Sequence, residues 1–131
     1  MELDIPEGIE FSAEKTVDEK DTAKAYGSGL VEVFATPAMV AFMEYTAHKS
    51  IEPYLPAGFS SVGIEIHTSH IKASPLGFKI TCHTKLAKAD GKKLFFKISA
   101  YDQDGLIGEG IHVRYVIDME KFMARLPQAK S

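Results

Sequence analysis

The sequence predicts an α+β fold in which one long antiparallel sheet wraps around a single central helix. Three features predict this fold: a weakly alternating opening segment, one apolar helical segment from Thr36 to about Ile51, and four strand-like runs joined by short connections. A leading strand, a buried helix and a series of long strands, in this order, allow a sheet to wrap one helix.

Composition limits the domain count and the class of function. The chain has 131 residues, of which 45% are hydrophobic, enough for one modest core. We therefore expect a single domain over residues 1–131. The 18 acidic and 15 basic side chains give a net charge of −3, and the basic residues are scattered. This charge distribution does not support a nucleic-acid partner. It does allow a small phosphate-bearing molecule as a ligand.

The start of the chain and its cysteine content bear on location. Residues 1–6 lack the basic start and apolar run of a secretion signal, and no apolar stretch approaches the roughly 20 residues of a membrane span. We expect a cytoplasmic protein with no membrane partner. Cys82 is the only cysteine, which excludes an internal disulfide and a multi-cysteine metal site. We expect a buried, unreactive thiol.

The opening elements are short. Phe11, Ala13 and Lys15 alternate weakly with polar residues, which indicates a first strand. The segment from Asp18 to Tyr26 could form a short helix that Gly27 stops.

The main helix has clear boundaries. Thr36 is a good N-cap, Pro37 suits the first helical position, and Pro53 limits the far end. Every residue from 38 to 43 is apolar. A helix that is apolar on all sides belongs inside a structure, either wrapped by a sheet or packed against a partner.

Four strand-like runs follow the helix, and turn residues separate them. Because the connections are short, we expect each strand to pair antiparallel with the next, as a meander. A sheet with one exposed face and long edge strands tends to dimerise. The runs cover roughly Ser60 to Lys72, Phe78 to Ala89, Leu94 to Tyr101 and Leu106 to Ile117, and the turns are Pro75-Leu76-Gly77, Ala89-Asp90-Gly91-Lys92 and Gln103-Asp104-Gly105.

One acid lies inside the apolar helix. The helical neighbours of Glu44 at three and four positions are Val40, Ala41, Ala47 and His48, so its side chain lies on or beside the apolar face. Polar groups in such surroundings are costly unless they are paired or used. The alternative is a partly exposed acid that pairs with His48.

A histidine ends the first of the long strands. His70 follows four residues at even spacing, so it shares their inward face if the strand has no bulge. The alternative is a core histidine with satisfied hydrogen bonds. His67 points the opposite way, which argues against a metal pair, and His48, His83 and His112 show no ligand spacing. We predict no metal. The four even-spaced residues are Val62, Ile64, Ile66 and Thr68.

Several motifs together resemble one known family. On these residues the chain resembles the hotdog-fold thioesterases and, among them, the fluoroacetyl-CoA thioesterase group, over roughly Val31 to Asp118. The motifs are Val33-Phe34-Ala35-Thr36 leading into Met39-Val40 and Glu44-Tyr45-Thr46, Gly63 before Ser69-His70-Ile71 and Ser74-Pro75, and Gly108-Glu109-Gly110-Ile111-His112 before Arg114.

The resemblance implies an activity and a set of site residues. The activity is hydrolysis of short, including substituted, acyl-CoA thioesters to acid and free CoA, with no cofactor. The family's threonine, glutamate and histidine correspond to Thr36, Glu44 and His70 here, although Thr36 could also be an ordinary helix cap. Substrate contacts are expected from Gly63, Phe34, Met39, Phe42 and Arg114.

One position departs from the family pattern. The residue after the catalytic threonine is expected to be glycine, and here it is Pro37. Because proline has no N–H, an oxyanion donor at this position is lost. A donor from Ala38 or Gly63 would have to serve.

Helix geometry separates two of the expected catalytic residues. A rise of 1.5 Å per residue places Thr36 and Glu44 about 12 Å apart along one helix, too far to act on the same carbonyl. We therefore expect a homodimer, or a tetramer built from dimers, in which the two residues that serve one substrate come from different chains.

Other functions stay open at this point. A hotdog enoyl-CoA hydratase would handle the same thioesters, although its usual aspartate followed five residues later by histidine is missing here. A non-catalytic protein that binds acyl-CoA or another small ligand would need the apolar pocket but not Glu44 or His70. A purely structural dimerisation domain would have no reason to hold inward polar residues.

Overall fold

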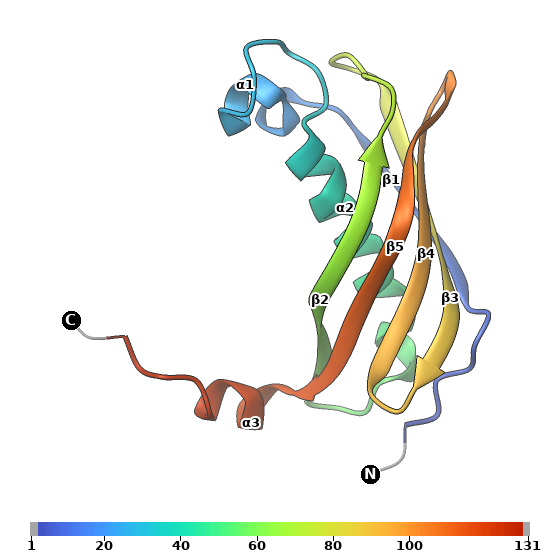
Figure 1. Cartoon of the computed structure of the whole chain (residues 1–131), viewed down its shortest axis with the longest axis vertical. Coiled ribbons are helices and arrows are strands. Elements are labelled where there is room, and N and C mark those ends of the chain that lie inside the picture. The colour runs from blue at the N-terminus through green and yellow to red at the C-terminus, as the bar shows by residue number, and fades with distance from the viewer. Residues whose placement is uncertain (1–2, 130–131) are drawn as a thin grey trace.

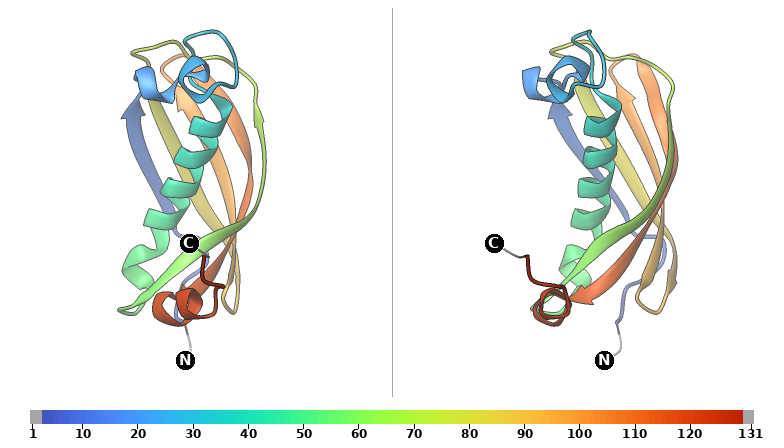
Figure 2. Two further views of the ribbon diagram at one scale, coloured as in Figure 1. Left: turned by 90° about the vertical axis from the view of Figure 1, so that its left-hand side faces the viewer. Right: turned by 60° about the vertical axis from the view of Figure 1, so that its left-hand side comes forward.

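The fold was analysed in a computed structural model, which describes residues 3–129 (Figure 1). A five-stranded antiparallel sheet curves around the long helix α2, which lies along its concave face (Figures 1 and 2). This confirms the predicted architecture. The strands are β1 (Glu10–Thr16), β2 (Phe59–His70), β3 (Lys79–Asp90), β4 (Lys93–Asp102) and β5 (Gly105–Asp118); the α-helices are α1 (Ala23–Tyr26), α2 (Thr36–Ile51) and α3 (Met119–Ala124); the 3-10 helices are η1 (Glu19–Asp21) and η2 (Glu52–Tyr54).

The strand order is β1-β3-β4-β5-β2, so the meander prediction is correct for β3, β4 and β5 and wrong for β2. β2 pairs with β5 at the edge of the sheet and not with β3. Residues 71–78 cross the end of the sheet instead of forming a hairpin. The Ile71 N–H donates to the Ile107 carbonyl, and the Gly77 N–H donates to the Val17 carbonyl.

Buried polar contacts hold this crossing segment. The Asp102 carboxylate accepts hydrogen bonds from Ser74 Oγ at 2.7 Å, from Lys72 Nζ at 3.4 Å and from the Asp104 N–H at 2.8 Å. Burial alone would raise the pKa of Asp102, but these partners lower it overall. The charged form is therefore favoured, and it ties the crossing segment to the end of β4.

The ends of the chain contain one expected and one unexpected element. The segment from Asp18 to Tyr26 is helical, but Thr22 divides it into η1 and α1, and Gly27 ends it with a left-handed φ of 74°. The sequence interpretation missed α3, whose start Asp118 caps by accepting a hydrogen bond from the Lys121 N–H.

The core lies between α2 and the concave face of the sheet. Met39, Met43 and Ile51 of the helix are fully buried there. Cys82 is also fully buried, and burial raises the pKa of its thiol to about 11, which agrees with the expected unreactive cysteine. Ala41 and Tyr45 are exposed, so the sheet covers only one side of the helix.

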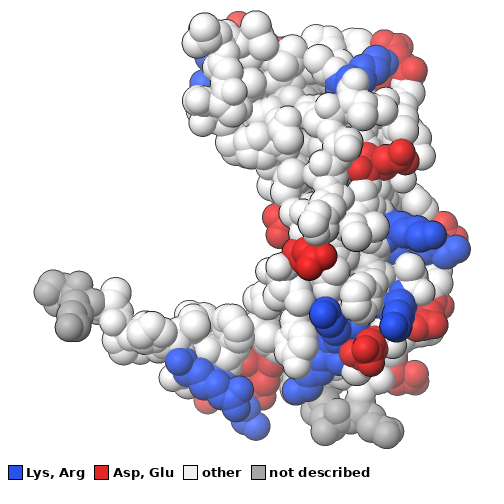
Figure 3. Space-filling model, viewed as in Figure 1, with Lys and Arg blue, Asp and Glu red and all other residues white. Residues whose placement is uncertain are grey.

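The surface shows no large patch of one charge in the view of Figure 1; acidic and basic side chains alternate, and the hollow side between α1 and α3 carries few of them (Figure 3). None of the helices in the described part of the chain has the length and hydropathy of a membrane span.

Candidate active site

Thr36 opens α2, but it is not the N-cap. Ala35 occupies the cap position with extended backbone and no side-chain cap hydrogen bond, so Thr36 and Pro37 are the first two helical residues. The predicted cap role is therefore wrong by one residue. The hydroxyl instead lies 2.8 Å from Nδ1 of His70, across the groove between α2 and the end of β2.

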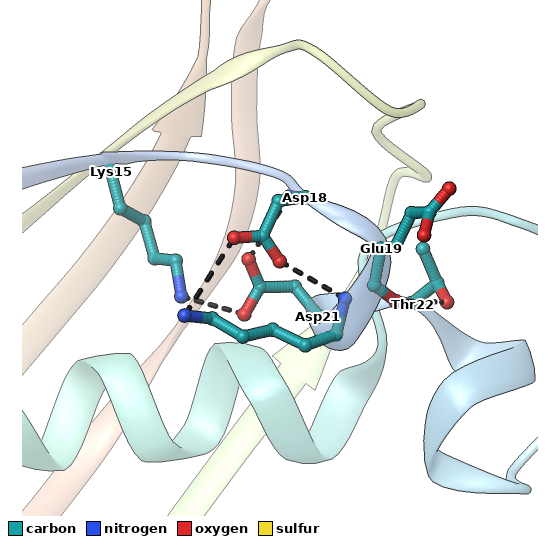
Figure 4. A network of polar contacts seen from close by, with 6 residues as sticks. Lys15, Asp18, Glu19, Asp21 and Thr22 are labelled. Atoms are coloured by element: carbon teal, nitrogen blue, oxygen red, sulfur yellow. Dashed lines mark hydrogen bonds and ion pairs between the residues drawn. The ribbon is translucent and has the colours of Figure 1, made fainter.

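A polar network positions the start of α2 (Figure 4). The Asp21 carbonyl accepts a hydrogen bond from the Ala35 N–H at 2.8 Å. The buried Asp21 carboxylate contacts Lys15 Nζ at 2.7 Å and accepts from the Asp18 N–H. Burial alone would raise the pKa of Asp21, whereas Lys15 and the Asp18 hydrogen bond lower it overall. A charged carboxylate therefore anchors the turn directly before Thr36.

His70 faces the helix, as expected, but the strand contains a bulge. The register of β2 against β5 shifts between Gly63 and Glu65, so Ile64 is an extra residue. Ile66 and Thr68 share the inward face with His70, whereas Val62 and Ile64 do not. The predicted inward orientation is therefore correct for Ile66 and Thr68, which follow the bulge, and wrong for Val62 and Ile64.

The imidazole of His70 is held on one side and free on the other. Nδ1 contacts the Thr36 hydroxyl, and the Phe34 ring packs edge-on against the imidazole, with the two ring centroids 6.4 Å apart. Nε2 is buried and has no hydrogen-bond partner in the described part of the chain. Burial lowers the pKa of His70, and the backbone of Lys72 partly opposes this. The neutral imidazole is therefore favoured, which leaves one nitrogen able to accept a proton. These residues line a hollow of about 430 Å³.

Glu44 lies farther along α2, opposite the bulge. It is half-buried, and its Oε2 is next to Gly63, where an added Cβ would lie only 2.7 Å away. His48 contacts Glu52 at 3.3 Å. His48 therefore pairs with Glu52 and not with Glu44, so the alternative of a Glu44–His48 pair is wrong.

A buried guanidinium accompanies Glu44. Arg114 is 7% exposed, and its Nε and Nη2 donate to the hydroxyl and the carbonyl of Ser61, at 2.7 and 2.8 Å. Its Nη1 lies 3.1 Å from Nε2 of His112. Burial lowers the pKa of Arg114 and the Glu44 charge opposes this. A positive charge is thus available next to the acid.

The three predicted aromatic and sulfur contacts lie in different places. Phe34 is beside His70. Met39 is fully buried and would meet a Cβ added at Gly108. Phe42 stacks on Tyr45 on another side of α2, so it is not grouped with Glu44.

The site residues therefore form two groups within one protomer. We call Thr36, His70 and Phe34 the Thr36 half-site, and Glu44, Gly63, Arg114 and His112 the Glu44 half-site. Thr36 and Glu44 are about 12 Å apart along the helix, and among residues 3–129 no hydrogen bond or ion pair joins the two half-sites. In the same described range, no group of three or more acidic, histidine or cysteine side chains could hold a metal ion.

Comparison with known proteins gives the family. A family model described as fluoroacetyl-CoA-specific thioesterase matches residues 17–120. The chain belongs to this family. The motif-based resemblance is thereby confirmed, and this member is a thioester hydrolase with the hotdog fold.

Individual relatives agree with this assignment. The thioesterase is 40% identical to a fluoroacetyl-CoA thioesterase of Streptantibioticus cattleyicolor over 97 residues, which are 74% of this chain and 70% of the relative. A crystal structure of a point mutant of a fluoroacetyl-CoA-specific thioesterase superposes with a TM-score of 0.88 at 34% identity and covers 93% of this chain and 95% of that one. A thioesterase superfamily member of Thermus thermophilus gives a TM-score of 0.85 at 29% identity, covering 92% and 90%.

Two residues that hold Arg114 in this thioesterase, Ser61 and His112, were not predicted as site residues. Ser61 carries no sequence signal, because it contacts Arg114 only after β2 and β5 have paired. His112 had a signal that was not used: it is two residues before Arg114 on one strand, and such residues share a face. The sequence interpretation included this histidine in a family motif and considered it as a metal ligand, but gave it no role beside Arg114.

Proposed function

We propose that this thioesterase hydrolyses short acyl-CoA thioesters with Thr36, Glu44 and His70 as its catalytic residues. The observation that carries the proposal is the imidazole of His70, oriented by Thr36 at Nδ1 and buried without a partner at Nε2. A buried polar atom without a partner is costly, so its retention favours a role in proton transfer.

The reaction needs a nucleophile and a proton carrier. In the proposed mechanism, water or the Glu44 carboxylate attacks the thioester carbonyl, and the C–S bond breaks as the thiolate leaves. His70 takes a proton from the attacking water and returns it to the thiolate, while attack by Glu44 itself would give an anhydride that water then opens. Acid and free CoA are the products in either case.

The developing negative charge needs donors that Pro37 does not supply. The first bond of the α2 ladder runs from the Met39 N–H to the Ala35 carbonyl, which leaves the Ala38 N–H outside the ladder. This N–H and the N–H of Gly63 are the proposed oxyanion donors, and the positive end of the helix dipole supports them.

We further propose that the working site forms between two protomers. Among the strands formed by residues 3–129, β2 ends the sheet, so its outer edge has no strand partner there. Large apolar side chains near the two half-sites are exposed, with Val31 and Ile71 at 60% and Ile64 at 52%. A second copy covering this face would bury them and could bring the Thr36 half-site of one protomer to the Glu44 half-site of its partner.

The substrate class is a small acyl group on CoA, fluorinated or not. Two of the relatives named above are described as fluoroacetyl-CoA thioesterases. The predicted cytoplasmic location suits a CoA thioester and stays a prediction.

Release of free thiol from a panel of acyl-CoAs of increasing length tests the function. We expect turnover of the short members, and a fall of about a hundred-fold or more in kcat for Glu44→Gln and for His70→Ala, the usual scale of acid–base catalysis. His83→Phe, on the outer face of β3, is the control. Absence of thiol release at every acyl length would contradict the proposal and would favour a ligand-binding protein.

A further inference from the structure

His112 is the most deeply buried histidine of the chain, at 1% exposure, and the proposed mechanism does not use it. Its Nδ1 lies 2.8 Å from the carbonyl oxygen of Glu65, and its Nε2 lies 3.1 Å from Nη1 of Arg114. A carbonyl can only accept and a guanidinium can only donate. Both contacts therefore require the same form, a neutral ring with the proton on Nδ1.

The Arg114 guanidinium is held by neutral acceptors alone. Two are the hydroxyl and the carbonyl of Ser61, and the third is Nε2 of His112. Within residues 3–129, Arg114 has no carboxylate at salt-bridge distance. These contacts use three of its five N–H groups, so two N–H groups stay available on a guanidinium that has the Glu44 carboxylate nearby but not in salt-bridge contact.

These groups converge on one point of the concave surface. A Cβ added to Gly63 would lie 2.7 Å from Glu44 Oε2, 3.1 Å from His112 Cε1 and 3.5 Å from Arg114 Nη1. The ring of Phe96 packs against the imidazole, with centroids 6.3 Å apart. His112 is thus fixed by Glu65, Phe96 and Arg114 together.

We propose that His112 is a positioning residue for thioester hydrolysis: locked as the Nδ1–H tautomer, it accepts a hydrogen bond from Arg114 and aims the remaining guanidinium N–H groups at the acyl oxygen beside Glu44. The inference rests on the proposed function and deepens it. If His112 were protonated, its Nε2–H would face the Nη1–H of Arg114, and the guanidinium would lose this acceptor. The charged and titratable groups that face the His112 ring are Arg114 from its own strand and Glu44 from α2, while His48 of α2 is close to Arg114.

A rescue series tests the proposal. His112→Phe keeps a ring against Phe96 and removes the acceptor; we expect kcat/KM to fall about ten-fold to a hundred-fold, the worth of one charge-assisted hydrogen bond. His112→Gln restores an acceptor and should recover most of this loss. His83→Phe is the matched control. Wild-type kcat/KM in His112→Phe would overturn the proposal, as would equal losses in the Phe and Gln variants.

A double-mutant cycle separates positioning from packing. If His112 acts through Arg114, then His112→Phe should have little further effect in an Arg114→Lys background, which keeps the charge but loses the planar fork. Full additivity would overturn the proposal. If His112→Phe does not fold, Ser61→Ala, which removes another acceptor of Arg114, should lower kcat/KM in the same direction, and wild-type activity there would contradict the positioning role.

Nitrogen NMR of the histidine side chains gives a readout that does not depend on activity. We expect His112 as the Nδ1–H tautomer at neutral pH, and a ring protonated on Nε2 would overturn the proposal. An active wild type with an unaffected His112→Phe would refute this inference alone, whereas a wild type that releases no thiol would refute the proposed function as well.

Discussion

At the residue scale, Gly63 decides whether Glu44 and Arg114 can share one space. A Cβ at this position would lie 2.7 Å from the Glu44 carboxylate, closer than packed atoms allow. Because the carboxylate ends a flexible side chain, Gly63→Ala should displace Glu44 without unfolding the protein. We predict a loss of about ten-fold or more in kcat, since small displacements at a reacting centre are costly, and only a small fall in the melting temperature, because the Cβ would also lie 3.1 Å from the buried His112 ring.

The control for this substitution is Gly29→Ala. A Cβ there would meet only the Cβ of Ala23, at 3.4 Å, so both activity and stability should be kept. The account of the Glu44 half-site would be wrong if Gly63→Ala hydrolysed acyl-CoA as fast as Gly29→Ala.

At the element scale, the segment that crosses from β2 to β3 depends on Asp102. Its buried carboxylate accepts from Ser74, Lys72 and the Asp104 N–H. Asp102→Ala would leave these donors unpaired, and we predict a loss of about 2–4 kcal/mol in the free energy of unfolding, measured in urea. Asp104→Ala is the control, because this side chain is 63% exposed and should contribute under about 0.5 kcal/mol. Equal effects of the two substitutions would contradict this description.

Most of the individual elements were predictable because each has a local signal; α3 was the exception. The apolar run bounded by Pro37 and Pro53 predicted α2, and turn residues such as Gly91 predicted the β3-β4-β5 meander. The bulge at Ile64 and the crossing of residues 71–78 had no such signal. Both depend on pairing with β5, which is distant in sequence, and the pattern of one strand does not contain that information.

The candidate site likewise has a part that was predictable from the sequence and a part that was not. Thr36, Glu44 and His70 were predicted from the family motifs, and Glu44 and His70 also from their positions on apolar faces. The contact between Thr36 and His70, and the support of Arg114 by Ser61 and His112, appear only in three dimensions, because each contact joins different elements.

At the scale of the whole molecule, several buried titratable groups should act on stability in the same direction. Burial lowers the pKa of His48, His70 and His112 from the ordinary 6.5. The unfolded chain therefore binds protons that the folded chain does not, and the free energy of unfolding should fall as the pH drops below about 6.5. The lowered pKa values of Asp21 and Asp102 extend the loss to pH values below 3.8.

Urea unfolding over a series of pH values measures this effect. His70→Gln removes one of the titrating groups, so its stability should depend less steeply on pH in the histidine range. A protein that became more stable between neutral and mildly acidic pH would contradict the assigned directions.

We propose that Thr36 and Glu44, which are about 12 Å apart on one helix, act on one thioester by coming from different protomers. Mixing subunits is the most direct test: His70→Ala and Glu44→Gln protomers, each expected to be nearly inactive alone, are unfolded and refolded together in equal amounts. If the half-sites of different protomers combine, one of the two sites in each mixed dimer is intact, and about a quarter of the wild-type thiol release should return. No recovery in a mixture shown to contain mixed dimers would contradict the account.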